Sequence, residues 1–99
     1  MTYFIDIDGT ICTQEKDGNY ANAKPYMNRI EKINKLYGEG NIIVYYTARG
    51  TTTGLDWKEI TEKQFKDWGV KCNEIRYEKP YYDKWIDDKA LSDKEFFDD

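Results

Sequence analysis

The segment FIDIDGT at residues 4–10 decides the fold of this chain. It places two carboxylates, with a single residue between them, at the end of an apolar run that starts at Tyr3. Residues two apart in a strand point to the same side, so Asp6 and Asp8 can face one common point. Two such carboxylates repel each other unless positive charge lies nearby, and Mg²⁺ binds a few protein carboxylates together with substrate phosphate. The segment therefore indicates a site for a divalent metal and a phosphate group.

The composition is that of one small domain with an acidic balance. The chain has 99 residues, of which 39% are hydrophobic and 16% aromatic, and aromatic side chains bury large areas in a compact core. Fifteen basic and nineteen acidic residues give a net charge of −4, which argues against sequence-independent nucleic-acid binding. We expect neither a membrane span nor a signal peptide, because apolar runs are short and a strand begins at the third residue.

The cysteine and histidine content excludes several kinds of site. Cys12 and Cys72 form no C-x-x-C pair, and the chain has no histidine. A disulfide framework and a zinc site are therefore not expected, and a reducing cytoplasmic location is the simplest expectation. Nucleophile schemes that pair serine or cysteine with histidine are excluded as well.

The apolar patterns alternate between strand and helix, which predicts an α/β fold with a parallel sheet and right-handed crossovers. Strands are expected at residues 2–7, 42–46, 73–77 and 82–86. One helix is expected from Pro25 to Gly38 and another from a capping box at Asp56 to Gly69, with a short C-terminal helix capped by Ser92. An irregular stretch at residues 9–24 and a Thr/Gly loop at residues 50–54 complete the chain.

Polar residues fall at the carboxyl ends of these strands, where parallel sheets bind ligands. Asp6 and Asp8 end the first strand, Thr47-Ala48-Arg49 follows the second, and Asp87-Asp88 follows the fourth. Lys79 lies in the loop before the fourth strand. We therefore expect these side chains to meet at one edge of the sheet.

Four motifs in this order resemble the haloacid dehalogenase (HAD) superfamily of phosphotransferases: FIDIDGT at 4–10, IVYYTAR at 43–49, Lys79-Pro80 and IDD at 86–88. The resemblance implies a single Rossmann-like, three-layer domain over residues 1–99. Residues 57–90 are similar to small phosphatases found among capsular polysaccharide biosynthesis genes. Only residues 9–24 separate the first strand from the first helix, which implies a short flap and no cap domain.

The resemblance implies a role for each motif residue. Asp6 is expected to attack phosphorus and Asp8 to act as general acid and base. Thr47 would donate to a phosphoryl oxygen, and Lys79 would neutralise charge on the transferring group. The other motif residues implied in phosphate or substrate binding are Gly9, Thr10, Ala48 and Arg49. Mg²⁺ is the implied cofactor, with the ligand set Asp6, the main chain of Asp8, Asp87 and Asp88.

Several alternatives remain open from the sequence. Lys84 competes with Lys79 for the lysine role, and Arg49 contacts either a second anionic group of the substrate or a nearby acid. The aromatic residues at 77–85 either stack a substrate ring or pack at the rim. Phe96 and Phe97 either dock the tail on the domain or contact a second copy in a homodimer.

The expected function is hydrolysis of a small phosphorylated metabolite, with a sugar or polyol phosphate as the first choice of substrate. One alternative is a nucleotide or polynucleotide end phosphatase, which the acidic balance disfavours. The other is a non-catalytic module that binds phosphate or metal.

Overall fold

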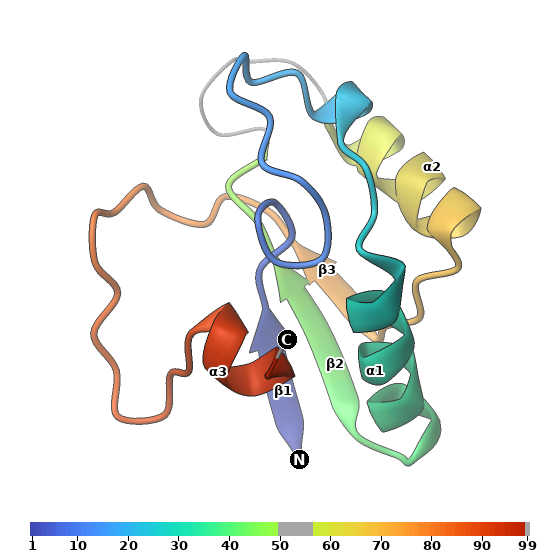
Figure 1. The fold of residues 1–99 in the computed structure, drawn as a ribbon, viewed down its shortest axis with the longest axis vertical. Helices are drawn as coiled ribbons and strands as arrows, with labels where there is room; N and C mark the ends of the chain where they lie inside the picture. The colour runs from blue at the N-terminus through green and yellow to red at the C-terminus, as the bar shows by residue number, and fades with distance from the viewer. Residues whose placement is uncertain (50–56, 99) are drawn as a thin grey trace.

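A computed structural model describes residues 1–49 and 57–98 of the chain (Figure 1). Strands β1 (Thr2–Ile5), β2 (Ile42–Tyr46) and β3 (Glu74–Arg76) form one parallel sheet in the order β1-β2-β3. Helix α1 (Met27–Gly38) lies between β1 and β2 in the chain, and α2 (Trp57–Trp68) lies between β2 and β3. The predicted α/β fold with a parallel sheet is confirmed for these three strands.

Local sequence sets the ends of the helices. Helix α3 (Asp93–Phe97) begins after the N-cap Ser92, whose Oγ accepts the Glu95 N–H at 3.2 Å, as in the serine half of the predicted capping box. Glu95 Oε1 accepts from the Ser92 hydroxyl at 3.0 Å. Helix α2 ends before Gly69, which has a φ of +71° that favours glycine. The predicted cap at Asp56 and the predicted loop at 50–54 lie outside the described residues.

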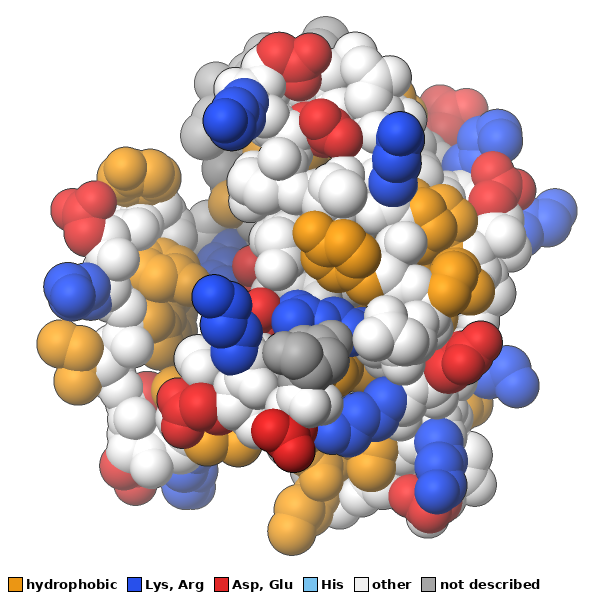
Figure 2. Space-filling view, viewed as in Figure 1, with side chains coloured by type: hydrophobic (Ala, Val, Ile, Leu, Met, Phe, Trp, Pro, Cys, Tyr) orange, Lys and Arg blue, Asp and Glu red, His pale blue; other side chains and the backbone are white. Residues whose placement is uncertain are grey.

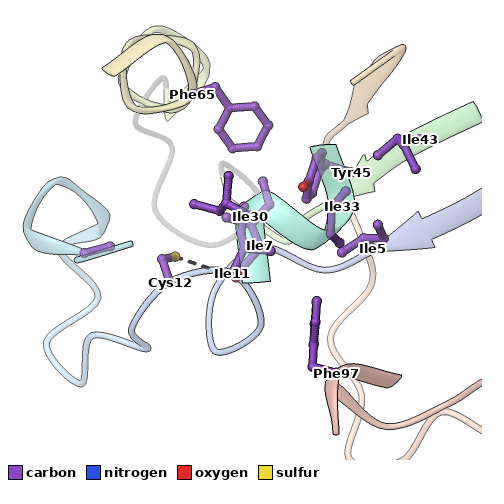
Figure 3. Close-up of a cluster of buried hydrophobic side chains, with 11 residues drawn as sticks. Ile5, Ile7, Ile11, Cys12, Ile30, Ile33, Ile43, Tyr45, Phe65 and Phe97 are labelled. Atoms are coloured by element: carbon purple, nitrogen blue, oxygen red, sulfur yellow. Dashed lines mark hydrogen bonds between the residues drawn. The ribbon is translucent and has the colours of Figure 1, made fainter. Parts of the chain in front are cut away.

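The core lies on one face of the sheet. Tyr3 and Ile5 of β1 are in register with Ile43 and Tyr45 of β2, so these four side chains share a face. Figure 3 shows side chains from the helices gathered against this face. They are Ile30 and Ile33 of α1, Phe65 of α2 and Phe97 of α3, joined by Ile7 and Ile11 from the segment after β1.

The three described helices all pack on one face of the sheet. Helices α1, α2 and α3 all contribute side chains to the same core cluster. On the opposite face, Phe4 remains 54% exposed and its ring lies near the Tyr46 ring and the Arg76 guanidinium, whereas Val44 is only 3% exposed. Helix α3 lies against α1, where Lys32 Nζ is 4.9 Å from the Phe96 ring centroid.

The C-terminal tail is docked on the domain. Phe97 is only 8% exposed, and its ring centroid lies 4.6 Å from the guanidinium carbon of Arg29 on α1. Arg29 Nη1 also donates to Asp93 Oδ2 at 2.8 Å and to the Thr10 carbonyl at 3.0 Å. The tail therefore contacts the turn that follows β1, in agreement with the prediction that the two phenylalanines dock it.

The segment at residues 9–24, the flap, has little regular structure. It contains a turn at Gly18, whose φ is +75°, and one short 3-10 helix, η1 (Tyr20–Asn22). Its two ends are joined where Cys12 forms an isolated bridge with Pro25, and α1 begins two residues after Pro25. The flap arches over the carboxyl ends of the strands in Figure 1.

The prediction of a fourth strand at residues 82–86 is wrong. After β3 the chain leaves the sheet, and residues 80–92 run as an exposed segment without a strand until α3 (Figure 1). Tyr82 and Trp85 pack against each other with ring centroids 5.0 Å apart, so the segment makes local ring contacts instead of pairing with β1. None of the helices in the described part of the chain is long and apolar enough to cross a bilayer.

Candidate active site

A pocket of about 160 Å³ lies at the carboxyl ends of β1 and β2. Parallel sheets bind their ligands at this edge, and the sequence places its polar motifs there. Three segments line the pocket: the chain after β1, the chain after β2 and the segment after β3. The lining residues are Asp6, Asp8, Gln14, Tyr20, Thr47, Ala48, Lys79, Pro80, Tyr81 and Tyr82.

The first motif forms a tight turn that presents both aspartates. The N–H groups of Thr10 and Ile11 donate to the Ile7 carbonyl at 3.1 and 2.9 Å, and the Gly9 N–H donates to the Cys12 carbonyl at 2.9 Å. Gly9 has a φ of +82°, a conformation that a side chain would strain. The buried Ile7 anchors the turn in the core, so Asp6 and Asp8 on either side of it face the pocket.

Asp6 and Lys79 form the charged centre of the pocket. Lys79 Nζ lies 3.7 Å from Asp6 Oδ1, and the side chains are 14% and 38% exposed, respectively. Burial raises the pKa of Asp6 above its ordinary value, and the neighbouring Lys79 offsets part of that rise. The sequence prediction that these two residues converge is confirmed by this contact.

Backbone hydrogen bonds hold Lys79 beside the end of β2. The Lys79 N–H donates to the Thr47 carbonyl at 2.9 Å, and the Thr47 N–H donates to the Arg76 carbonyl at 2.9 Å. Outside this link, the rings of Tyr82 and Trp85 lie 5.2 and 5.8 Å from Lys79 Nζ. The backbone of Lys79 is therefore held at the end of β2, and two aromatic rings lie near its ammonium group. Lys84, the alternative lysine, is exposed and does not line the pocket.

Arg49 is buried beside the pocket and forms an ion pair with Asp8. Its Nε donates to Asp8 Oδ2 at 3.0 Å, and its Nη2 donates to Asp8 Oδ1 at 2.9 Å. The Arg49 side chain is fully buried, and that of Asp8 is 10% exposed. Of the two alternatives for Arg49, the structure has the one in which it pairs with a nearby acid. The substrate contact predicted for it is not formed from this position, because the guanidinium does not line the pocket.

Two residues of α2 complete the surroundings of Arg49. Its Nη1 donates to Thr61 Oγ1 at 2.9 Å and to Gln64 Oε1 at 2.6 Å. Gln64 Nε2 in turn donates to the Tyr20 carbonyl at 2.7 Å, which ties the flap to the same group. The sequence held one sign that Gln64 would bond a buried group: it is a polar residue within the apolar stripe of the predicted helix. A buried amide needs hydrogen-bond partners.

Gly9 and Thr10, also predicted to bind phosphate, do not line the pocket directly. Gly9 shapes the turn, and Thr10 Oγ1 approaches Asp6 Oδ2 at a long 3.5 Å. Thr47 and Ala48 do line it, as expected. The sequence missed Gln14, Tyr20, Tyr81 and Tyr82, since neither flap residues nor loop aromatics carry a pattern that shows which way they face.

Asp87 and Asp88 are not brought to this pocket. Both are exposed in a local turn, where Asp87 Oδ1 accepts the Lys89 N–H at 2.9 Å. That hydrogen bond holds the pKa of Asp87 below its ordinary value. Within residues 1–49 and 57–98, no group of three or more Cys, Asp or Glu side chains is placed to hold one metal ion. The expected four-residue ligand set is not assembled, because its last two members depended on the strand that does not form.

Hydrophobic side chains gather on the segment at residues 80–92, which lies at the left of Figure 2, separated by a recess from the body of the domain. Tyr81 is 86% exposed, Tyr82 40% and Trp85 47%. The pocket is therefore bordered by rings on an exposed segment on one side and by Tyr20 of the flap on another.

Comparison with protein-family models gives no match, and no curated protein matches the chain significantly. A crystal structure of a target protein from Vibrio cholerae is similar, with a TM-score of 0.84 and 27% sequence identity. The match covers 97% of this chain and 86% of that one. The two chains therefore share a fold over nearly their whole length.

Proposed function

We propose that this chain is a phosphomonoester hydrolase of the haloacid dehalogenase type that acts through an aspartyl-phosphate intermediate. The observation that carries the proposal is the contact of Asp6 with Lys79 in a pocket that Asp8 also lines. A carboxylate nucleophile, a second carboxyl group and a cation in one recess are what stepwise phosphoryl transfer needs.

In the first step, a carboxylate oxygen of Asp6 forms a bond to phosphorus while the bond from phosphorus to the leaving oxygen breaks. The electron pair of that bond stays on the leaving oxygen, which takes a proton from the Asp8 carboxyl group. In the second step, water attacks phosphorus and gives a proton to the Asp8 carboxylate. The bond between Asp6 and phosphorus breaks, releasing inorganic phosphate and restoring both side chains.

Lys79 and Thr47 stabilise the transferring group in this scheme. The Lys79 ammonium group lies beside Asp6, so it faces the charge that develops on the phosphoryl oxygens. Thr47 Oγ1 accepts the Arg49 N–H at 3.1 Å, which leaves its own hydroxyl proton for a phosphoryl oxygen.

Magnesium dependence stays a prediction of the sequence. Of the residues expected to bind the metal, only Asp6 and Asp8 line the pocket among the described residues. The described side chains do not fit a complete Mg²⁺ site, since Asp87 and Asp88 lie in a separate exposed turn. The chemistry is therefore assigned to the side chains of the pocket alone.

A small phosphorylated metabolite, such as a sugar or polyol phosphate, is the proposed substrate. The pocket volume of about 160 Å³ suits a phosphoryl group with a small leaving group, and three tyrosines line it. A sugar face packs well on such rings. The proposal includes a domain without a cap and a reducing cytoplasmic location. The free thiols of Cys12 and Cys72 support the location.

The test is turnover of p-nitrophenyl phosphate by the full chain in a buffer containing Mg²⁺. Asp6→Asn is expected to abolish turnover, while the matched surface variant Asp67→Asn keeps it, because Asp67 only pairs with Lys63 on an exposed face of α2. Quenched reactions with radiolabelled substrate should leave a label on the wild-type chain that hydroxylamine removes. Full activity of Asp6→Asn would refute the proposal.

A further inference from the structure

We propose that Arg49 is a positioning residue that fixes the Asp8 carboxyl group for proton transfer to the leaving group. The inference deepens the proposed function and rests on it, since it assigns a role toward the proton donor of that reaction. Arg49 itself touches neither the pocket nor a substrate in it.

Arg49 and Asp8 form a bidentate ion pair. Two different nitrogens of one guanidinium, Nε and Nη2, each donate to a different oxygen of Asp8, at 3.0 and 2.9 Å. Such bidentate contacts fix the plane of the carboxyl group as well as its distance. A lysine could supply the charge at this place but not the two directions.

The contact leaves Asp8 able to act on the pocket side. A carboxylate has about four lone-pair positions; Arg49 occupies one on each oxygen, and the proton that is transferred can be held at one of the two that remain. The Cys12 thiol approaches Oδ1 at 3.6 Å, so Oδ2 has the freer remaining position. Because Asp8 lines the pocket while Arg49 does not, the guanidinium approaches from the core and the remaining position is available to a bound ester.

Contacts with α2 and the flap hold the Arg49 side chain in place. Thr61 and Gln64 of α2 accept from Nη1, and the Tyr20 ring centroid lies 5.0 Å from the guanidinium carbon. The position of Asp8 therefore depends on the flap and on α2, which is distant from β1 in the chain. An internal anchor of this kind limits rotation of the carboxyl group, which productive proton transfer requires.

Stability alone gives a weak reason for this arrangement. Buried ion pairs cost so much desolvation that well-packed hydrophobic side chains of similar volume are often equally stable. Arg49 is completely buried in a domain of 99 residues, and it bonds the one carboxyl group that both faces the pocket and lies next to the proposed nucleophile. A role in orienting that group explains the choice of residue.

The test compares two esters that differ in their need for a proton. Glycerol phosphate releases an alkoxide that must be protonated, whereas p-nitrophenyl phosphate releases a phenolate that is stable without a proton. For Arg49→Met we expect kcat for glycerol phosphate to fall about 100-fold, the lower end of what general acid catalysis contributes, and kcat for the nitrophenyl ester to fall by about tenfold at most. Arg76→Met, which removes a half-exposed arginine paired with Glu74, should change neither rate.

The outcomes separate the inference from the proposed function. If Arg49→Met is folded by circular dichroism and loses both activities equally, the positioning role is overturned. If it does not fold, Thr61→Val decides, because it removes one acceptor of Nη1 without touching Asp8. A several-fold loss confined to glycerol phosphate supports the inference, and an equal loss or no loss overturns it. A wild-type chain that hydrolyses neither ester overturns the proposed function, and the inference falls with it.

Discussion

Docking of the C-terminal tail can be tested by Phe97→Ala. Phe97 is 8% exposed, packs in the core cluster that contains Ile5, and lies under the Arg29 guanidinium. Truncating a buried phenylalanine costs about 3–5 kcal/mol. Because α3 has only five residues and can relax, we expect the lower end, a loss of about 3 kcal/mol in the free energy of unfolding. A domain of this size has about 5–15 kcal/mol in total, so the variant should still fold.

The assay is urea unfolding followed by circular dichroism. With a urea dependence of about 1–3 kcal/mol per molar, the loss lowers the unfolding midpoint by about 1 M or more. Leu91→Ala is the control, because Leu91 is 64% exposed and its truncation should cost less than about 0.5 kcal/mol. If Phe97→Ala loses no more than Leu91→Ala, the tail does not belong to the core and the packing argument is refuted.

Four further predictions concern charge and chemistry. Lys79→Met should lower turnover of p-nitrophenyl phosphate by about 100-fold or more, and Lys84→Met should leave it nearly unchanged; the reverse ranking would exchange their roles. The resemblance found in the sequence predicts that EDTA stops turnover and that added Mg²⁺ restores it, whereas full activity in EDTA would rule out the metal. Burial and the neighbouring carboxylates raise the pKa of Cys12 to about 12, so thiol reagents at neutral pH should modify Cys12 only after unfolding, as peptide mapping would show. Arg29 holds the pKa of Asp93 below its ordinary value. The stability that this ion pair adds is therefore fully present at pH values above the ordinary pKa of Asp93, and it is lost as the pH falls through the lowered pKa. Asp93→Asn should thus reduce the loss of thermal stability at acid pH.

The sequence predicted the half of the site that depends on strand order. Asp6, Thr47 and Lys79 follow strands or a loop of a parallel sheet, and any parallel arrangement of β1 and β2 brings their carboxyl ends together. Their convergence was therefore a consequence of topology and needed no knowledge of side-chain packing.

The other half depended on long-range contacts that local pattern does not encode. Residues 82–86 have the composition of a strand, yet Tyr82 and Trp85 pack on each other and over Lys79, so Asp87 stays in the solvent. The burial of Arg49 follows from the docking of α2, which provides Gln64. Neither outcome can be read from residue spacing alone.

Under the proposed function, the backbone link between Lys79 and Thr47 has a consequence for how the domain could diversify. The backbone of Lys79, just before Pro80, is fixed by this hydrogen bond, whereas Tyr81 and the residues up to 92 belong to an exposed stretch. Insertions or replacements beyond the proline would remodel the entrance while the reacting groups kept their places. New substrates could thus be acquired by changing one surface stretch, without rebuilding the chemistry beneath it.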